Sequence, residues 1–226
     1  MNILFVITSH DQLGNTGRKT GFWVEEFAAP YYTFKDNGYN IKIATPKGGQ
    51  APIDPSSEAE SAQTSATERY YKDKETQNLI EHTYLLSEMK ASDFDAVFYP
   101  GGHGPLWDLA NDEDSAKLIL DFYNSGKPVG AVCHAPGVFK NVKFENGESF
   151  VKGKNVTGFS NSEEEAVQLT NVVPFLVEDE LQKLGGHYTK GADWGVHIVE
   201  DGLLITGQNP ASSEAAAEKI MSLLKK

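Results

Sequence analysis

Cysteine is almost absent from this sequence of 226 residues, in which Cys133 is the only one. A lone cysteine cannot form an intramolecular disulfide, so its presence fits a reducing compartment and leaves a free thiol to explain. A free cysteine is more often a small buried hydrophobe than a reactive group. The sequence around Cys133 is therefore needed to distinguish a packing role from a chemical one.

Positive charge is also scarce, because 20 Lys and Arg face 32 Asp and Glu, a formal net charge of −12. Affinity for nucleic acids depends largely on cations that neutralise phosphates, so we expect no nucleic-acid partner. Anionic membrane surfaces are disfavoured for the same reason, and no apolar run approaches the roughly 18 to 20 residues of a membrane span. The apolar stretch 1–8 has no basic flank or cleavage site, so we expect a first buried strand and a soluble, cytoplasmic protein.

Short apolar runs rich in β-branched and aromatic residues alternate with helical patterns along the chain. Runs that are apolar on both faces suit a mainly parallel sheet covered by helices on each side, which makes the expected fold an α/β three-layer sandwich of flavodoxin-like type. We expect one domain over residues 1–226, with ligands bound beyond the carboxyl ends of the strands. The predicted strands are 3–8, 41–44, 96–99, 129–132 and 203–206.

Helical periodicity, turn residues and caps predict the remaining elements. Pro30 lies inside the first predicted helix, where it crowds the carbonyl of Glu26, so we expect a kink or break there. The segment 46–75 is polar, rich in Ser and Pro, and without a sustained period, so we interpret it as an excursion over the surface. The predicted helices are 20–36, 77–90, 112–126, 173–184 and 209–226, and a β-hairpin is predicted at 143–156.

The stretch KPVGAVCHAPG at 127–137 is a short apolar strand that ends in the thiol of Cys133. The residues that follow suit a tight turn into a helix, the cysteine counterpart of the nucleophile elbow of hydrolases. A helix N-terminus favours a thiolate over a thiol, so the stretch predicts a reactive cysteine. The next residue, His134, is a candidate proton relay.

A second strand end carries the glycine-rich loop YPGGHGP at 99–105. Taken alone it is most often a simple turn, but beside Cys133 its glycines allow backbone N–H groups to approach a substrate oxygen. Gly101 and Gly102 are therefore candidates for an oxyanion hole, with His134 as a further donor. His103 and Trp194 are candidates for lining the same pocket, where packing or capping roles are as common.

The two strand-end motifs, YPGGHGP and AVCHAP at 131–136, resemble the DJ-1/PfpI superfamily, whose fold is class I glutamine amidotransferase-like. The similarity is greater to its Hsp31-like, glyoxalase III branch. It extends to KTGFWVEE at 19–26, TGFSNSEE at 157–164 and LITGQNPAS at 204–212. Five separated motifs in the same order cover most of the chain.

The resemblance implies that Cys133 is the nucleophile, with His134 beside it and Glu26 as the acid of the first helix. A carboxyl group beside a thiolate is expected to keep its proton, because two adjacent anions repel each other. The triad-like acid falls on Glu164, although the neighbouring Glu163 and Glu165 leave this assignment open. The implied activity is conversion of methylglyoxal to lactate through a hemithioacetal, with no metal and no other cofactor.

Other activities stay open from the sequence. A glutamine amidotransferase usually takes its histidine and glutamate from one strand face, whereas His197 and Glu200 are three residues apart and point to opposite faces. A cysteine peptidase needs a wider site. The resemblance also allows a holdase chaperone with unfolded-protein clients, a redox sensor, a protein or nucleotide deglycase, and a homodimer. For the glyoxalase III activity that the resemblance implies, the expected partner is a small dicarbonyl substrate.

Overall fold

The protein is described here by a computed structural model that covers residues 1–225. Its centre is a seven-stranded sheet in the order β3-β2-β1-β4-β5-β9-β8, in which only β8 and β9 pair antiparallel. The predicted, mainly parallel α/β sheet is therefore confirmed. The strands are β1 (Asn2–Val6), β2 (Asn40–Thr45), β3 (Tyr84–Leu85), β4 (Ala96–Tyr99), β5 (Val129–Val132), β8 (Ile198–Asp201) and β9 (Leu204–Gly207).

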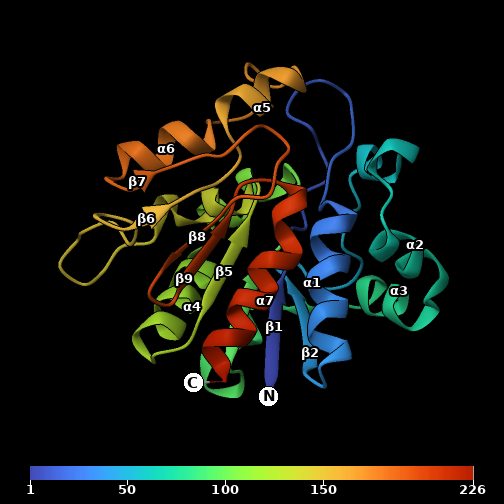
Figure 1. Ribbon diagram of the computed structural model, residues 1–226, viewed down its shortest axis with the longest axis horizontal. Coiled ribbons are helices and arrows are strands. Elements are labelled where there is room, and N and C mark those ends of the chain that lie inside the picture. Colours follow the sequence, from blue (N-terminus) through green and yellow to red (C-terminus); the bar gives the residue numbers. More distant parts are fainter. Residues whose placement is uncertain (226) are drawn as a thin grey trace.

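Helices cover both faces of this sheet, because side chains of a strand alternate between the two faces. Along β1, Leu4 and Val6 join one buried cluster, whereas Ile3 and Phe5 join the other. The helices α1 (Val24–Asp36) and α7 (Ser213–Leu224) pack side by side over the second cluster (Figure 1). The helix α4 (Glu113–Asn124) packs on the first. Two further helices, α5 (Asn161–Ala166) and α6 (Val177–Lys183), belong to the upper rim in Figure 1.

The polar segment 46–75 is more regular than its composition suggests. It contains the helix α2 (Ser65–Lys72) and leads into α3 (Lys74–Glu81), and both lie beside α1 (Figure 1). Thr64 caps α2 through a reciprocal pair of hydrogen bonds with Thr67. Tyr70 is 3% exposed and its ring meets Phe27 of α1 edge-on at 6.0 Å. Buried contacts of this kind hold the segment to the rest of the domain, although its hydrophobic period is weak.

Two predicted elements differ from the structure. The helix predicted over 77–90 ends at Glu81, because Thr83 pairs with Gly49 and β3 then joins the sheet edge. The hairpin predicted over 143–156 is reduced to one bridge between Lys143 and Ser149. Its second half instead forms β6 (Asn155–Val156), which pairs in parallel with β7 (His187–Tyr188). Pairing with a distant segment overrides local pattern in both cases.

Helix ends also shift. The first helix begins at Val24, because the backbone N–H of Phe22 bonds Pro52 and the chain there is extended. It continues through Pro30 to Asp36, so a break beside Glu26 is wrong, whereas the alternative of a kink there stays a prediction. The last helix starts at Ser213 after a short turn, and residue 226 of that prediction lies outside the described residues. No helix within residues 1–225 is long and apolar enough to cross a membrane.

We predict that Tyr70→Ala lowers the free energy of unfolding by about 3 kcal/mol, because it removes a large buried ring from the contact with α1. Tyr84→Ala is the matched control, since Tyr84 is 49% exposed and surface changes usually stay within about 0.5 kcal/mol. Urea unfolding followed by circular dichroism measures both. Equal effects of the two substitutions would contradict the packing described for residues 46–75.

Candidate active site

The site is built on an unusual backbone conformation at Cys133, directly after β5. Cys133 has φ of 60°, a left-handed value that is uncommon for any residue other than glycine. Two backbone hydrogen bonds hold it there, from its N–H to Gly207 at 2.9 Å and from the N–H of Phe159 to its carbonyl at 2.8 Å. The sharp turn directs the side chain away from the sheet toward the loops, as in a nucleophile elbow.

Cys133, His134 and Glu164 form a continuous chain of polar contacts. The Cys133 Sγ lies 3.2 Å from His134 Nδ1, and His134 Nε2 lies 2.6 Å from Glu164 Oε2. Because a carboxylate only accepts hydrogen bonds, His134 carries its proton on Nε2 and presents the lone pair of Nδ1 to the thiol. Burial, with the nearby His103, lowers the pKa of His134, so the ring is neutral and able to accept a proton.

The three consecutive glutamates of α5 separate into different environments. Glu164 is the one that contacts His134, and its pKa is lowered because two histidines donate to its carboxylate against the cost of burial. Glu163 is fully buried and accepts hydrogen bonds from the N–H of Ser160 and the N–H of Trp194. Glu165 is exposed and accepts a hydrogen bond from Thr170. The contact with His134 expected for Glu164 is therefore present.

His103 occupies a place that the sequence indicated only as pocket lining. Its Nε2 lies 2.7 Å from Glu164 Oε1, and its ring packs 3.9 Å from that of His134. The nitrogen and oxygen atoms of His103, His134 and Glu164 lie within 4.8 Å of one another, which is close enough for a metal ion. Both histidines, however, already bond the carboxylate directly. The arrangement orients His134 toward the thiol without any further ligand.

Glu26 approaches Cys133 from the opposite side, from the first turn of α1. It is fully buried, and its Oε2 accepts the N–H of Gly101 at 2.7 Å. Its Oε1 has no close hydrogen-bond partner in the part of the chain that the structure describes, and the Cys133 thiol is the polar group beside it. Burial raises the pKa of Glu26 to about 8, so this carboxyl group keeps its proton at neutral pH.

Burial opposes the thiolate that the turn after β5 was expected to favour. Burial, followed by the Glu26 carboxyl group, raises the pKa of the Cys133 thiol well above its usual range. The element after Cys133 is a 3₁₀-helix (Ala135–Asn141) rather than an α-helix, so a helix dipole gives little compensation. The pKa values of Cys133 and Glu26 are both raised, and His134 is the base placed to take up the thiol proton.

The glycine-rich loop brings a backbone donor to the sulfur. The backbone N–H of Gly102 lies close enough to the Cys133 sulfur to lower the pKa of its thiol, and Gly102 has φ of 90°. A Cβ at this position would lie 2.4 Å from the carbonyl oxygen of Gly21, so only glycine fits. The geometry of Gly102 suits an oxyanion donor. The N–H of Gly101, by contrast, is already bound to Glu26.

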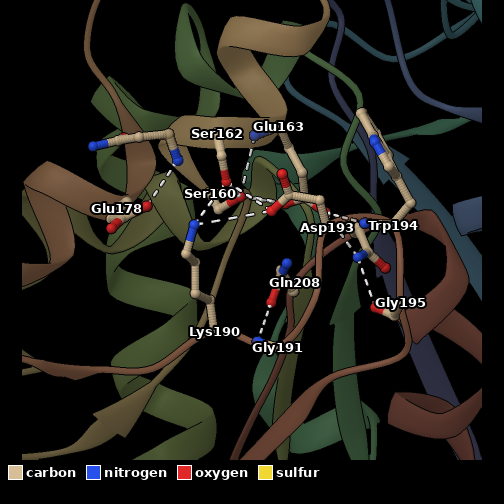
Figure 2. A network of polar contacts seen from close by, with 12 residues as sticks. Ser160, Ser162, Glu163, Glu178, Lys190, Gly191, Asp193, Trp194, Gly195 and Gln208 are labelled. Atoms are coloured by element: carbon tan, nitrogen blue, oxygen red, sulfur yellow. Dashed lines mark hydrogen bonds and ion pairs between the residues drawn. The ribbon is translucent and has the colours of Figure 1, made fainter.

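Trp194 belongs to a loop, residues 189–197, that a polar network ties to α5 (Figure 2). Its N–H donates to Glu163 Oε1 at 2.8 Å, and Lys190 donates to Ser162, which donates to Asp193 at 2.7 Å. The backbone of Trp194 is left-handed at φ of 64°. Its ring meets Phe159 at 5.8 Å, so the indole forms one wall of the pocket as expected.

These residues enclose a cavity of about 40 Å³ around the thiol. Since one water needs roughly 10 to 15 Å³, the cavity admits a molecule of a few heavy atoms. Trp23 also lines it, a residue that the sequence patterns did not single out although it directly precedes α1. His197 and Glu200, the candidate amidotransferase pair, do not line the cavity. His197 bonds Thr189, and Glu200 bonds Lys219.

The fold and this site define a class: α/β proteins with a cysteine on a nucleophile elbow, paired with a histidine and flanked by a buried carboxyl group. A family model for the DJ-1/PfpI family matches residues 19–223. The chain belongs to the DJ-1/PfpI family, as its motifs indicated.

Two curated relatives of the chain are named as glyoxalases. The chain is 29% identical to glyoxalase 3 of Candida albicans over 98% of both chains. It is 28% identical to the glutathione-independent glyoxalase HSP31 of Saccharomyces cerevisiae, over 99% of this chain and 98% of that one. The crystal structure of C. albicans glyoxalase III superposes with a TM-score of 0.90 at 28% identity, covering 99% of this chain and 97% of the other. A Francisella tularensis rapid encystment protein of 24 kDa reaches 0.94 at 38% identity, covering 99% and 98%.

We predict that Glu26 makes the protein less stable as pH rises from about 5 to about 8. In the unfolded chain the carboxyl group ionises near 4.5, whereas in the folded protein it stays protonated until about 8. The unfolded state therefore binds fewer protons in this window, and stability falls by a few kcal/mol across it. Glu26→Gln keeps an oxygen for Gly101 and removes the titration.

Urea unfolding at pH 5 and pH 8 measures this effect. The stability of Glu26→Gln relative to wild type should rise by a few kcal/mol between the two pH values. Glu165→Gln, which changes an exposed carboxylate of α5, is the control and should show no such trend. Parallel pH dependence in wild type and Glu26→Gln would mean that Glu26 is ionised in the folded protein.

Proposed function

We propose that this protein is a glyoxalase III, which converts methylglyoxal and water to lactate without glutathione or another cofactor. The observation that carries this proposal is the pairing around Cys133. A neutral, base-competent His134 lies on one side of the sulfur, and a protonated Glu26 lies on the other. Such a site can both activate a thiol and move a second proton.

The reaction begins with removal of the thiol proton. His134 Nδ1, held by Glu164, takes the proton as the sulfur attacks the aldehyde carbon of methylglyoxal. The N–H of Gly102 stabilises the developing alkoxide, with a further donor at His134 expected from the sequence. Glu26 then gives its proton to that oxygen. The result is a hemithioacetal on Cys133, a protonated His134 and an ionised Glu26.

Isomerisation follows within the same cavity. The Glu26 carboxylate removes the hydrogen from C1 as the protonated His134 gives its proton to the oxygen on C2, which gives an enediol. Glu26 then returns its proton to C2, and the hydroxyl group on C1 gives its proton back to His134. C1 is thereby oxidised to a thioester while the ketone at C2 is reduced to an alcohol, so no external oxidant is needed. Water then attacks the thioester and loses a proton to Glu26, and His134 protonates the departing sulfur. Lactate leaves, and all three residues regain their starting protonation.

The site also weighs against alternatives. A cavity of about 40 Å³ is too small for a polypeptide segment, which disfavours a peptidase. A raised thiol pKa disfavours a redox sensor, whose cysteine needs thiolate character. A homodimer, unfolded-protein clients, deglycase activity and a cytoplasmic location are expectations from the sequence that stand beside this proposal.

Cys133→Ala should lower kcat for methylglyoxal by at least about 10³-fold, because no hemithioacetal can form. Lactate formed in the absence of glutathione is the direct measurement. His197→Ala is the control, since His197 lies outside the cavity, and it should keep the wild-type rate. A Cys133→Ala protein that still makes lactate would refute the function, whereas suppression of aggregation by the same inactive variant would assign holdase activity to another surface.

Glu164→Gln should lower kcat by about 10²- to 10⁴-fold with little change in KM, because it removes the carboxylate that orients His134 and stabilises its protonated form. The neighbouring Glu165→Gln is the matched control and should behave as wild type. His103→Asn, which leaves the carboxylate in place, should cost about tenfold. Steady-state kinetics separate these effects, and an unchanged kcat in Glu164→Gln would exclude the triad.

A further inference from the structure

A second cavity opens directly outside the catalytic one. Its volume is about 340 Å³, against about 40 Å³ around the thiol, and the two share Trp23, Trp194 and Pro210 in their walls. The size lies within the ordinary range for small-molecule sites. Methylglyoxal has only five heavy atoms and fills the inner cavity alone. The outer cavity therefore has no role in the reaction proposed above.

The wall of the outer cavity is preorganised. Glu163 holds the backbone of Trp194, and Asn209 bonds both Glu163 and the carbonyl of Gly195, at 2.9 and 2.8 Å (Figure 2). On the far side, Thr64 caps α2 and donates to Glu25 Oε2. A fixed wall loses little conformational entropy when a ligand binds.

The chemistry of this wall combines flat aromatic surfaces with free hydrogen-bonding groups. Within residues 1–225, no hydrogen bond is formed by the indole N–H of Trp23 or of Trp194, nor by the hydroxyls of Ser56 and Ser61. Glu25 Oε1 is likewise free, and no Lys or Arg lines the cavity. The lining therefore offers donors and acceptors to hydroxyl groups and nothing that would neutralise a phosphate.

We propose that the outer cavity binds the neutral, polyhydroxylated tail of a sugar-derived 2-oxoaldehyde whose dicarbonyl head reacts at Cys133. This inference rests on the proposed function and names a substrate class for the same site. The reaction is unchanged: the 2-oxoaldehyde and water give the corresponding 2-hydroxy acid, and the tail takes no part in bond making. A phosphorylated tail fits less well, because the lining includes the Glu25 carboxyl group and no Lys or Arg.

The test compares methylglyoxal with 3-deoxyglucosone, a 2-oxoaldehyde that carries a four-carbon hydroxylated tail. In wild type, KM for 3-deoxyglucosone should be about tenfold lower than KM for methylglyoxal, which corresponds to about 1.4 kcal/mol of tail binding. Ser61→Tyr places a large side chain in the outer cavity only. It should raise KM for 3-deoxyglucosone about tenfold and leave kcat and KM for methylglyoxal unchanged.

Ser92→Tyr is the matched control, because Ser61 and Ser92 are both exposed central residues of three-residue 3₁₀ turns. Calorimetry on Cys133→Ala adds a readout without turnover: 3-deoxyglucosone should bind, and Ser61→Tyr in that background should weaken the binding about tenfold. Loss of activity on both substrates in Ser61→Tyr would overturn the inference. Equal KM values of the wild-type enzyme for methylglyoxal and 3-deoxyglucosone would also overturn it. A wild-type enzyme inactive on methylglyoxal would instead refute the proposed function.

Discussion

The hydrogen bond from the Gly101 backbone to the buried Glu26 carboxyl group is the contact on which the site depends. It joins the first turn of α1 to the end of β4 at 2.7 Å and leaves the second carboxyl oxygen beside Cys133. A Cβ on Gly101 would lie 2.6 Å from Glu26 Oε2 and 3.0 Å from the Cβ of Cys133. Only glycine allows the loop, the helix and the elbow to meet this closely, and this closeness desolvates both acidic groups.

Desolvation decides the resting state of the nucleophile. An exposed cysteine at a helix start would carry a partial negative charge and would be open to oxidation. Cys133 is 2% exposed and lies beside a carboxyl group, burial raises the pKa of its thiol, and His134 is placed to accept the thiol proton. Reactivity in this arrangement depends on a transfer between two neutral groups rather than on a standing thiolate.

Features that depend on local pattern were predictable from the sequence. The apolar runs predicted five strands of the sheet, and adjacent motif residues placed Cys133, His134 and the glycine loop at neighbouring strand ends. Features that depend on a distant partner were not. The pairing of β6 with β7, the packing of Tyr70 on Phe27 and the bond between His103 and Glu164 join residues more than 30 positions apart. The protonation of Cys133 was missed because burial has no local signature.

Consecutive glutamates in α1 show how one turn of helix can serve two compartments. Residues that follow each other in an α-helix are rotated by about 100°, so Glu25 and Glu26 face different directions from the same backbone. Glu26 enters the closed cavity, where desolvation gives it a proton to exchange. Glu25 faces the open cavity between Trp23 and Thr64, where a carboxyl oxygen remains available to a ligand. The reaction, which needs water excluded, and the binding of the tail, which takes place in the open cavity, thus use two adjacent residues of one helix. This arrangement lets a small catalytic cavity act on the larger substrate that we propose.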